Sequence, residues 1–313
     1  MTRPLKIGTR GSKLALWQAE HVRSLLGGLD IAAAIVVIRT TGDDRLDASL
    51  AQLDRGVFVR EIEHALLRSE VDLAVHSMKD LPTSIPAGLT IAAYCARHDV
   101  QDCLVSRTGA RLRDLPAGGR VGTSSLRRQA QLRHHRPELI CEDIRGNVDT
   151  RLRKLREGQY DAIVLARAGL ERLGLAAEIA EILDTDVLLP AVGQGAVGIE
   201  AREDDAAALG LLARIDHAPT AIAVRAERAL LREIEGGCQV PLGAWCRPDP
   251  ASAGELLMDA CMVSLDGGRY VREHLSGVSR DPESLGVRLA HRLRAAGGDA
   301  ILAELRSTAS GDV

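Results

Sequence analysis

The chain contains 313 residues, of which 46% are hydrophobic and only 2% are aromatic, and its formal net charge is −3. This length predicts two or three domains, and the small net charge argues against a general nucleic-acid binder or membrane-surface binder. No apolar run reaches the ~18 residues that a membrane span requires. No secretory signal is visible, so we expect a cytoplasmic protein whose six cysteines are reduced thiols.

The N-terminal part alternates short apolar stretches with stretches of helical periodicity. Strands are predicted at 4–8, 35–39 and 71–77, and helices at 14–28 and 57–70. Gly27 and Gly28 are expected to end the first helix as C′ residues. This alternation predicts a parallel sheet covered by helices.

The same style of pattern restarts near residue 100 and changes near residue 218. Strands are predicted at 102–106, 120–124, 139–146 and 161–169, with helices at 126–135 and 148–158. After the change, a long helix at 219–237 precedes strands at 256–265 and 269–277, joined by a DGG turn, and a final helix at 282–298. The pattern therefore predicts a second α/β unit and a third, smaller α+β domain.

A glycine motif, GQGAVG at 193–198, matches the dinucleotide fingerprint G-x-G-x-x-G. That fingerprint requires a preceding strand and a helix that opens directly from the glycines. Pro190 interrupts the approach, and the following VGIEA is predicted as a strand, with a helix only near Asp204. A tight backbone crossing between domains is therefore favoured over a nucleotide site.

Two strand-to-helix turns are flanked by arginine. GTSSLRR at 122–128 and RGNVDTR at 145–151 each place a glycine and a capping residue before a helix. Such turns offer backbone N–H groups to anions. The window 118–158 holds nine arginines and one lysine against five acidic residues, a local charge of +5. This pattern favours an anion-binding cleft at the carboxyl edge of a sheet; the alternative is ordinary capping with solvated arginines.

A lysine and a carboxylate follow the strand at 71–77 directly, in VHSMKDLPT at 75–83. Ser77 and Asp80 have the spacing of a capping box, but Pro82 prevents a regular helix from continuing. A carboxylate on a loop at a strand end is placed like a catalytic acid. Lys79 would lower the pKa of Asp80 and burial would raise it, and the sequence leaves that balance open.

One cysteine stands in a loop, in EGGCQVPLG at 235–243. Cys238 and Cys246 lack histidine or cysteine partners at zinc spacing, so we expect no metal site. The remaining cysteines lie in apolar stretches and are predicted to be core thiols: Cys95, Cys103, Cys141 and Cys261. For Cys238, a core role and a functional role both stay open.

Taken in order, five motifs resemble the porphobilinogen deaminase (hydroxymethylbilane synthase) family: VHSMKDLPT, VGTSSLRRQAQL, IRGNVDTRLRKL, LPAVGQGAVGIE and EGGCQVPLG. The opening IGTRGSKLALWQA and the segment GVFVREIEHALL match as well. The resemblance is densest before residue 245. It implies a transferase that joins four porphobilinogen molecules head to tail, losing ammonia each time, to give 1-hydroxymethylbilane for tetrapyrrole and haem synthesis.

The resemblance also implies a fold and a cofactor. Two periplasmic-binding-protein-like α/β domains form a cleft, and a smaller α+β domain carries the cysteine loop. The expected boundaries are 1–97 with 194–215, then 98–193, then 216–313. A dipyrromethane cofactor, made from substrate, would be held by a thioether to Cys238. The small-molecule partner would be porphobilinogen, and the protein would be a monomer without nucleic-acid or membrane partners.

Residue roles follow from the same resemblance. Asp80 is the expected catalytic carboxylate, helping ammonia to leave. The expected cofactor contacts, besides Cys238 and Asp80, are Lys79, Thr123, Ser124, Ser125, Arg127, Arg128 and Arg151. The expected substrate contacts are Arg10, Ser12, Gln18, Phe58, Arg145, Asn147, Arg172 and Gln194. One loop departs from the family: AQLDRG at 51–56 keeps Arg55 as its only cation where lysines are usual. The competing hypotheses are a non-catalytic anion-binding protein of the periplasmic-binding type and a nucleotide-dependent enzyme built on GQGAVG.

Overall fold

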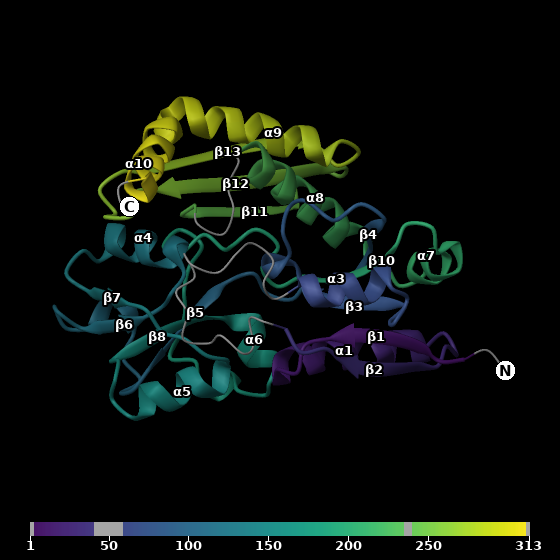
Figure 1. Cartoon of the computed structure of the whole chain (residues 1–313). Helices are drawn as coiled ribbons and strands as arrows, with labels where there is room; N and C mark the ends of the chain where they lie inside the picture. Colours follow the sequence, from purple (N-terminus) through teal and green to yellow (C-terminus); the bar gives the residue numbers. More distant parts are fainter. Residues whose placement is uncertain (1–2, 41–58, 235–239, 311–313) are drawn as a thin grey trace. The chain divides into compact units, whose positions relative to one another are not determined.

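The computed structural model describes residues 3–40, 59–234 and 240–310 (Figure 1). Phe58 and Cys238 lie outside these described residues. The chain divides into two compact units. The first unit comprises Met1–His98 and Gly195–Ala221, and the second comprises Asp99–Gln194 and Ile222–Val313. No helix in the described ranges is long and apolar enough to span a membrane.

The first unit is built on a five-stranded sheet. Its strand order is β2 (Ala33–Val37), β1 (Leu5–Thr9), β3 (Leu73–Ser77), β10 (Val197–Arg202) and β4 (Leu89–Tyr94). β1 runs parallel to β2 and β3, but β10 runs antiparallel to both β3 and β4. The predicted all-parallel sheet is therefore wrong, because the strand that returns from the second unit enters the sheet in the opposite direction.

The described residues of the first unit form the helices α1 (Lys13–Gly27), α3 (Arg60–Leu67) and α7 (Ala206–Leu212). α1 buries Ala19, Val22 and Leu26 in the core of the unit, together with Ile7 of β1. The helix ends at Gly27 as predicted, but Gly28 has φ −64°, and the left-handed residue is Asp30 with φ 61°. The C′ role predicted for the two glycines is thus wrong, although the helix boundary is right.

The second unit contains a sheet with the same pattern of strand directions. Its order is β7 (Ile140–Glu142), β6 (Arg120–Gly122), β8 (Ala162–Ala166), β5 (Asp102–Ser106) and β9 (Glu181–Ile182). β6 is parallel to β7 and β8, and β5 is antiparallel to β8 and β9. The accompanying helices are α4 (Leu126–His135), α5 (Val148–Arg156) and α6 (Arg167–Arg172).

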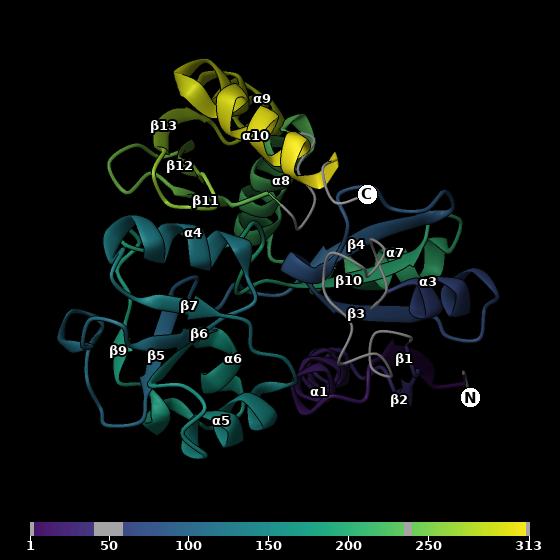
Figure 2. The same cartoon turned by 60° about the vertical axis from the view of Figure 1, so that its left-hand side comes forward.

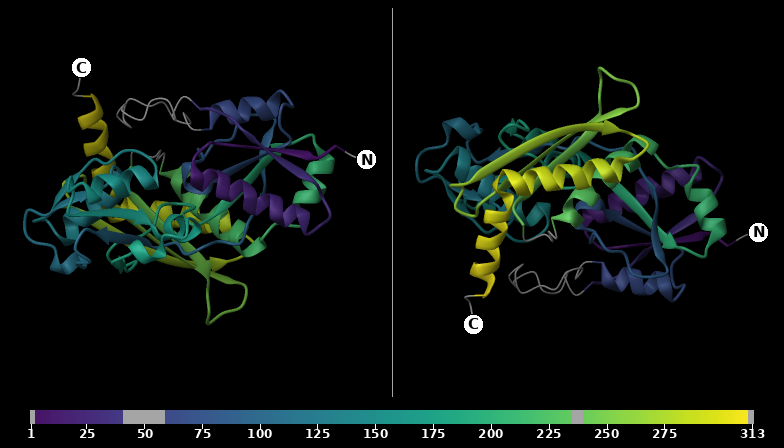
Figure 3. Two further views of the ribbon diagram at one scale, coloured as in Figure 1. Left: turned by 90° about the horizontal axis from the view of Figure 1, so that it is seen from below. Right: turned by 90° about the horizontal axis from the view of Figure 1, so that it is seen from above.

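The C-terminal part of the second unit is an antiparallel sheet of three strands with helices. Its elements are β11 (Leu242–Pro248), β12 (Glu255–Val263), β13 (Tyr270–Val278), α9 (Pro282–Leu293) and α10 (Asp299–Ser310), together with α8 (Ala218–Glu233), whose first four residues belong to the first unit. Figure 3 shows α9 lying across β12 and β13. β11 was not predicted, because the glycines and the proline around Cys238 indicated a loop. α10 was not predicted either, because the final helix was expected to end at residue 298. The chain does leave the helical conformation at Gly297, with φ 120°, but a new helix begins at Asp299.

Helix α4 lies between the two sheets of the second unit and contacts both (Figure 2). Leu132 of α4 packs with Val121 of β6 in the core of the five-stranded sheet. On the other side, Ala130 packs against Cys261 and Val263 of β12. The predicted fold class, two α/β sheets with a smaller α+β part, is confirmed. Helix α4, whose first turn carries the predicted arginines, is therefore packed between the two sheets.

Candidate active site

Lys79 and Asp80 lie on a single 3-10 turn, Met78–Asp80, that directly follows β3. Met78 is buried and Asp80 is exposed. The chain leaves the turn in extended conformation at Leu81, as expected before a proline, which restricts the residue preceding it. The catalytic candidate thus stands at the carboxyl end of a buried strand, where α/β folds place ligand contacts.

Ser77 does not cap this turn with its side chain. Its hydroxyl instead accepts a hydrogen bond of 2.7 Å from the Nε2 of Gln18, which is buried on α1. The capping-box interpretation of Ser77 and Asp80 is therefore wrong. Gln18 was predicted to contact substrate, and the structure places it beside the Lys79–Asp80 turn. Ser12 is the N-cap of α1 and accepts from the N–H of Ala15 at 3.2 Å, and Arg10 is half-buried just before it.

The glycine motif at 193–198 supports the same turn from β10. No helix opens from it, because β10 begins at Val197, so a dinucleotide site is excluded. Gly193 and Gly195 have φ of 72° and 83°, in the left-handed region that favours glycine. A Cβ at Gly198 would lie 2.2 Å from the Sδ of Met78. Gly198 is thus required for the close approach of Met78, the residue before Lys79.

Two buried acidic side chains, one on β10 and one on α3, lie in the same unit. The Nε2 of His76 on β3 lies 3.1 Å from the Oε2 of Glu200 on β10, and both side chains are buried. Glu63 of α3 is only 6% exposed, and burial, with a smaller contribution from Glu200, raises its pKa to about 7. One oxygen each of Glu63 and Glu200 has no hydrogen-bond partner among the described residues.

Replacing Glu63 by glutamine is expected to stabilise the protein above neutral pH. The raised pKa means that Glu63 binds its proton more tightly in the folded state than in the unfolded state. The contribution of Glu63 to the free energy of unfolding therefore falls as the pH rises from 4.5, the pKa of the unfolded state, through about 7, the pKa of the folded state. At pH 8 the gain is at most about 3 kcal/mol, and below pH 4.5 it vanishes. Thermal unfolding from pH 4 to 9 measures this, with exposed Glu203→Gln as the control. A stability difference independent of pH would contradict the prediction.

The two arginine-flanked turns of the second unit lie side by side, as predicted. β6 and β7 are parallel, with Gly122 opposite Glu142, and the buried hydroxyl of Ser124 joins their ends. It donates to the carbonyl of Ile144 at 2.8 Å and accepts from its N–H at 3.0 Å. The Oγ1 of Thr123 accepts from the N–H of Ser125 at 3.3 Å. Two of the predicted hydroxyls thus shape the turn itself.

The second of these turns uses its predicted residues in a similar way. Asn147 caps α5 by accepting from the N–H of Thr150 at 3.0 Å. Arg151 donates from Nε to the carbonyl of Gly146 at 2.8 Å. Arg145 is paired weakly with Asp143, at 3.6 Å. Arg172 ends α6 and is half-buried. Asn147 and Arg151 thus bind the backbone of the turn itself.

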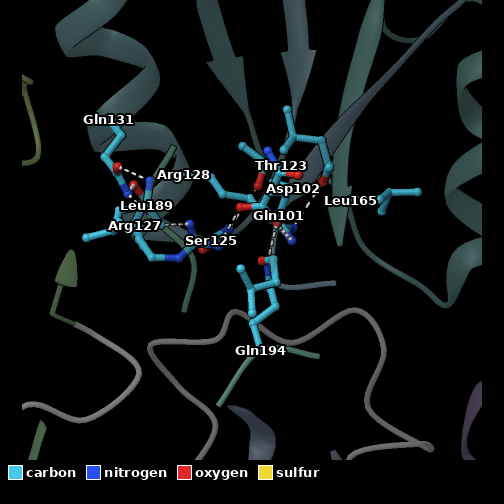
Figure 4. Close-up of polar contacts among 12 residues, drawn as sticks. Gln101, Asp102, Thr123, Ser125, Arg127, Arg128, Gln131, Leu165, Leu189 and Gln194 are labelled. Carbon is cyan, nitrogen blue, oxygen red and sulfur yellow. Dashed lines mark hydrogen bonds and ion pairs between the residues drawn. The ribbon is translucent and has the colours of Figure 1, made fainter. Parts of the chain in front are cut away.

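Arg127 and Arg128 are both buried, so the alternative of solvated arginines is wrong for them. Each donates from Nη2 to a different oxygen of Asp102, at 2.8 and 2.7 Å (Figure 4). Gln194, predicted as a substrate contact, is fully buried and donates to the same carboxylate at 2.8 Å. Sequence reasoning missed Asp102, because nothing local links it to residues 25 positions further along the chain.

The predicted core position is confirmed for three of the four thiols. Cys95, Cys103 and Cys261 are buried, and Cys141 is half-buried. Burial raises the pKa of Cys103 to about 12 and that of Cys261 to about 11, so these thiols are unreactive at neutral pH. Cys246, for which the sequence indicated no role, belongs to β11, and its side chain packs into the hydrophobic core.

Two family models match the chain. "Porphobilinogen deaminase, dipyromethane cofactor binding domain" covers residues 5–209, and "Porphobilinogen deaminase, C-terminal domain" covers residues 221–295. The chain belongs to the porphobilinogen deaminase family. The porphobilinogen deaminase of Desulforudis audaxviator is 52% identical over 99% of this chain and 100% of its own. That of Gloeobacter violaceus is 51% identical over 97% of this chain and 94% of its own.

Among solved structures, a periplasmic substrate-binding protein of an ABC transporter from Coxiella burnetii aligns over 72% of this chain and 96% of its own, with 13% identity and a TM-score of 0.43. A likeness of this size carries no conclusion about function. Membership of the porphobilinogen deaminase family confirms the predicted transferase class and the dipyrromethane cofactor. The alternative of a non-catalytic anion-binding protein is not favoured.

Proposed function

We propose that this enzyme joins four porphobilinogen molecules head to tail, releasing ammonia at each transfer, to give 1-hydroxymethylbilane on a dipyrromethane tethered to Cys238 by a thioether. The observation that carries this proposal is the placement of Asp80. An exposed carboxylate follows Lys79 at the carboxyl end of a buried strand, on a turn supported by Gln18 and Gly198. A carboxylate so placed is available to a bound, cationic intermediate.

Asp80 would act at the aminomethyl group of the substrate. Departure of ammonia leaves a positive charge on the substrate pyrrole, and a carboxylate held nearby stabilises that charge as it develops. Each transfer then forms one carbon–carbon bond and releases the proton of the attacked pyrrole carbon. The bound cofactor supplies the pyrrole carbon at which the first substrate is joined. Lys79 would bind a carboxylate of the growing chain.

The residues of the second unit fit a dipyrromethane. Each pyrrole carries two carboxylates, and buried anions require positive partners. The Nε atoms of Arg127 and Arg128 are buried without a hydrogen-bond partner among the described residues, which matches a carboxylate absent from the protein itself. With them, the proposed cofactor contacts are Lys79, Asp80, Thr123, Ser124, Ser125 and Arg151. The proposed substrate contacts are Arg10, Ser12, Gln18, Phe58, Arg145, Asn147 and Arg172.

The tether is tested by the intact mass of the purified, active protein. The mass of two pyrrole units is expected on the chain, and peptide mapping is expected to place it on Cys238. The buried Cys246 provides an internal control, because its thiol lies in the core. Fully active protein with an unmodified Cys238 would refute the tether.

We further propose that the enzyme is a cytoplasmic monomer with three domains, bounded as the sequence predicts. The first unit supports the first boundary, since it ends at His98 and resumes at Gly195. Light scattering on the purified protein tests the monomer. Most of the two segments that would form separate second and third domains, 98–193 and 216–313, falls within one compact unit, which comprises Asp99–Gln194 and Ile222–Val313. Limited proteolysis near residue 216 tests whether the two segments separate.

A further inference from the structure

The carboxylate of Asp102 is the centre of a buried hydrogen-bond network (Figure 4). Asp102 begins β5 and has no exposed surface. Its Oδ2 accepts from Arg127, and its Oδ1 accepts from both Arg128 and Gln194, at 2.7–2.8 Å. The three donors reach it from the first turn of α4 and from the segment before β10.

Each donor of this network is also fixed to a main-chain carbonyl. Arg127 donates from Nη1 to Leu189 at 2.6 Å, Arg128 donates from Nη1 to Val164 at 3.0 Å, and Gln194 donates to Val100 at 2.8 Å. The two guanidiniums are therefore held at two points each. Their remaining Nε–H groups are buried and have no hydrogen-bond partner among the described residues.

The network also has an unbalanced charge. One carboxylate faces two guanidiniums, and the side chains of all three are at most 7% exposed. Burial lowers the pKa of Arg127 despite the attraction of Asp102, and the neighbouring charge of Arg128 lowers it further. A simple structural ion pair needs only one arginine. An excess positive charge together with two unsatisfied N–H donors is matched by one further carboxylate.

We propose that Asp102 is a positioning residue, which holds Arg127 and Arg128 so that their Nε–H groups bind one carboxylate of the covalent cofactor. Gln194 shares this role and does not contact the substrate. The inference rests on the proposed function, because it requires that the cofactor be bound in the second unit. Asp102 itself, being fully buried and an anion, would touch neither cofactor nor substrate.

Asp102→Asn tests this proposal through cofactor loading rather than through activity. The readout is the fraction of folded, monodisperse protein that carries two pyrrole units on Cys238, measured by intact mass. Loss of a charged acceptor for both arginines is expected to lower that fraction about tenfold. The matched control is Glu227→Gln. Glu227 is also fully buried in the second unit, but it accepts from the backbone N–H groups of Gly193 and Cys246, at 2.7 and 2.9 Å.

Both substitutions remove a buried carboxylate and are expected to lower the melting temperature, but only Asp102→Asn should lower loading. If Asp102→Asn does not fold, Gln194→Met tests the proposal instead. This substitution keeps the three charges of the network and removes only one hydrogen-bond donor to Asp102. The fraction of Gln194→Met protein that carries the cofactor should fall severalfold. Loading equal to that of the wild type in the folded variants would overturn the proposal, as would an equal loss in Glu227→Gln. Active wild-type protein without the added mass would instead refute the proposed tether.

Discussion

Replacing Asp80 by asparagine is expected to lower kcat by about a hundredfold or more while leaving the fold and the cofactor in place. Asparagine has nearly the same shape but no charge, so it cannot stabilise the positive charge that remains when ammonia leaves. Because Asp80 is exposed, the free energy of unfolding should change by no more than about 0.5 kcal/mol. Ammonia release, measured on protein whose cofactor mass has been verified, gives kcat directly.

A matched control for this substitution is Asp204→Asn. Asp204 is an exposed carboxylate of the same unit, in the turn between β10 and α7. It should retain the kcat of the wild type, which separates a local role of Asp80 from a general effect of surface charge. Near-normal ammonia release by cofactor-loaded Asp80→Asn would remove Asp80 from the chemistry.

Replacing Gly198 by alanine is expected to lower both stability and kcat. The new Cβ would lie 2.2 Å from the Sδ and 3.3 Å from the Cγ of Met78. Met78 is 1% exposed, so its side chain cannot move into solvent and must repack inside the core. Overpacking of this kind costs about 1–3 kcal/mol. Because Lys79 and Asp80 follow Met78 on the same short turn, kcat should fall about tenfold through misplacement of Asp80.

The turn can be tested separately from the glycine. The double variant Gly198→Ala, Met78→Ala removes the clashing side chain and should recover part of the lost kcat. Gly210→Ala is the matched control: Gly210 lies in α7 with no atom within 4 Å of its added Cβ, so alanine there should be neutral or slightly stabilising. Wild-type kcat and melting temperature for Gly198→Ala would show that Gly198 does not support the turn.

Most helices and strands could be predicted from the sequence, because their signals are local. The predicted helix at 126–135 matches α4, and the strand at 102–106 matches β5. β11 was missed because its first residues were predicted to belong to the loop at 235–243. Its buried residues Leu242, Ala244 and Cys246 nevertheless alternate along the chain as in a strand. That alternation was a usable signal, and the neighbouring glycines and proline obscured it.

The sequence predicted which residues belong to the candidate site, but not which residues they contact in the folded protein. The sequence alone determined that Asp80 follows a strand, that the two arginine-flanked turns share one sheet edge, and which family the motifs resemble. Only the tertiary structure decided the strand directions, because these depend on where β10 and β5 enter their sheets. It also decided that Gln18 supports Ser77, that Gly198 makes room for Met78, and that Asp102 holds both arginines. These contacts join residues far apart in the chain, and neither periodicity nor local spacing carries information about such pairs.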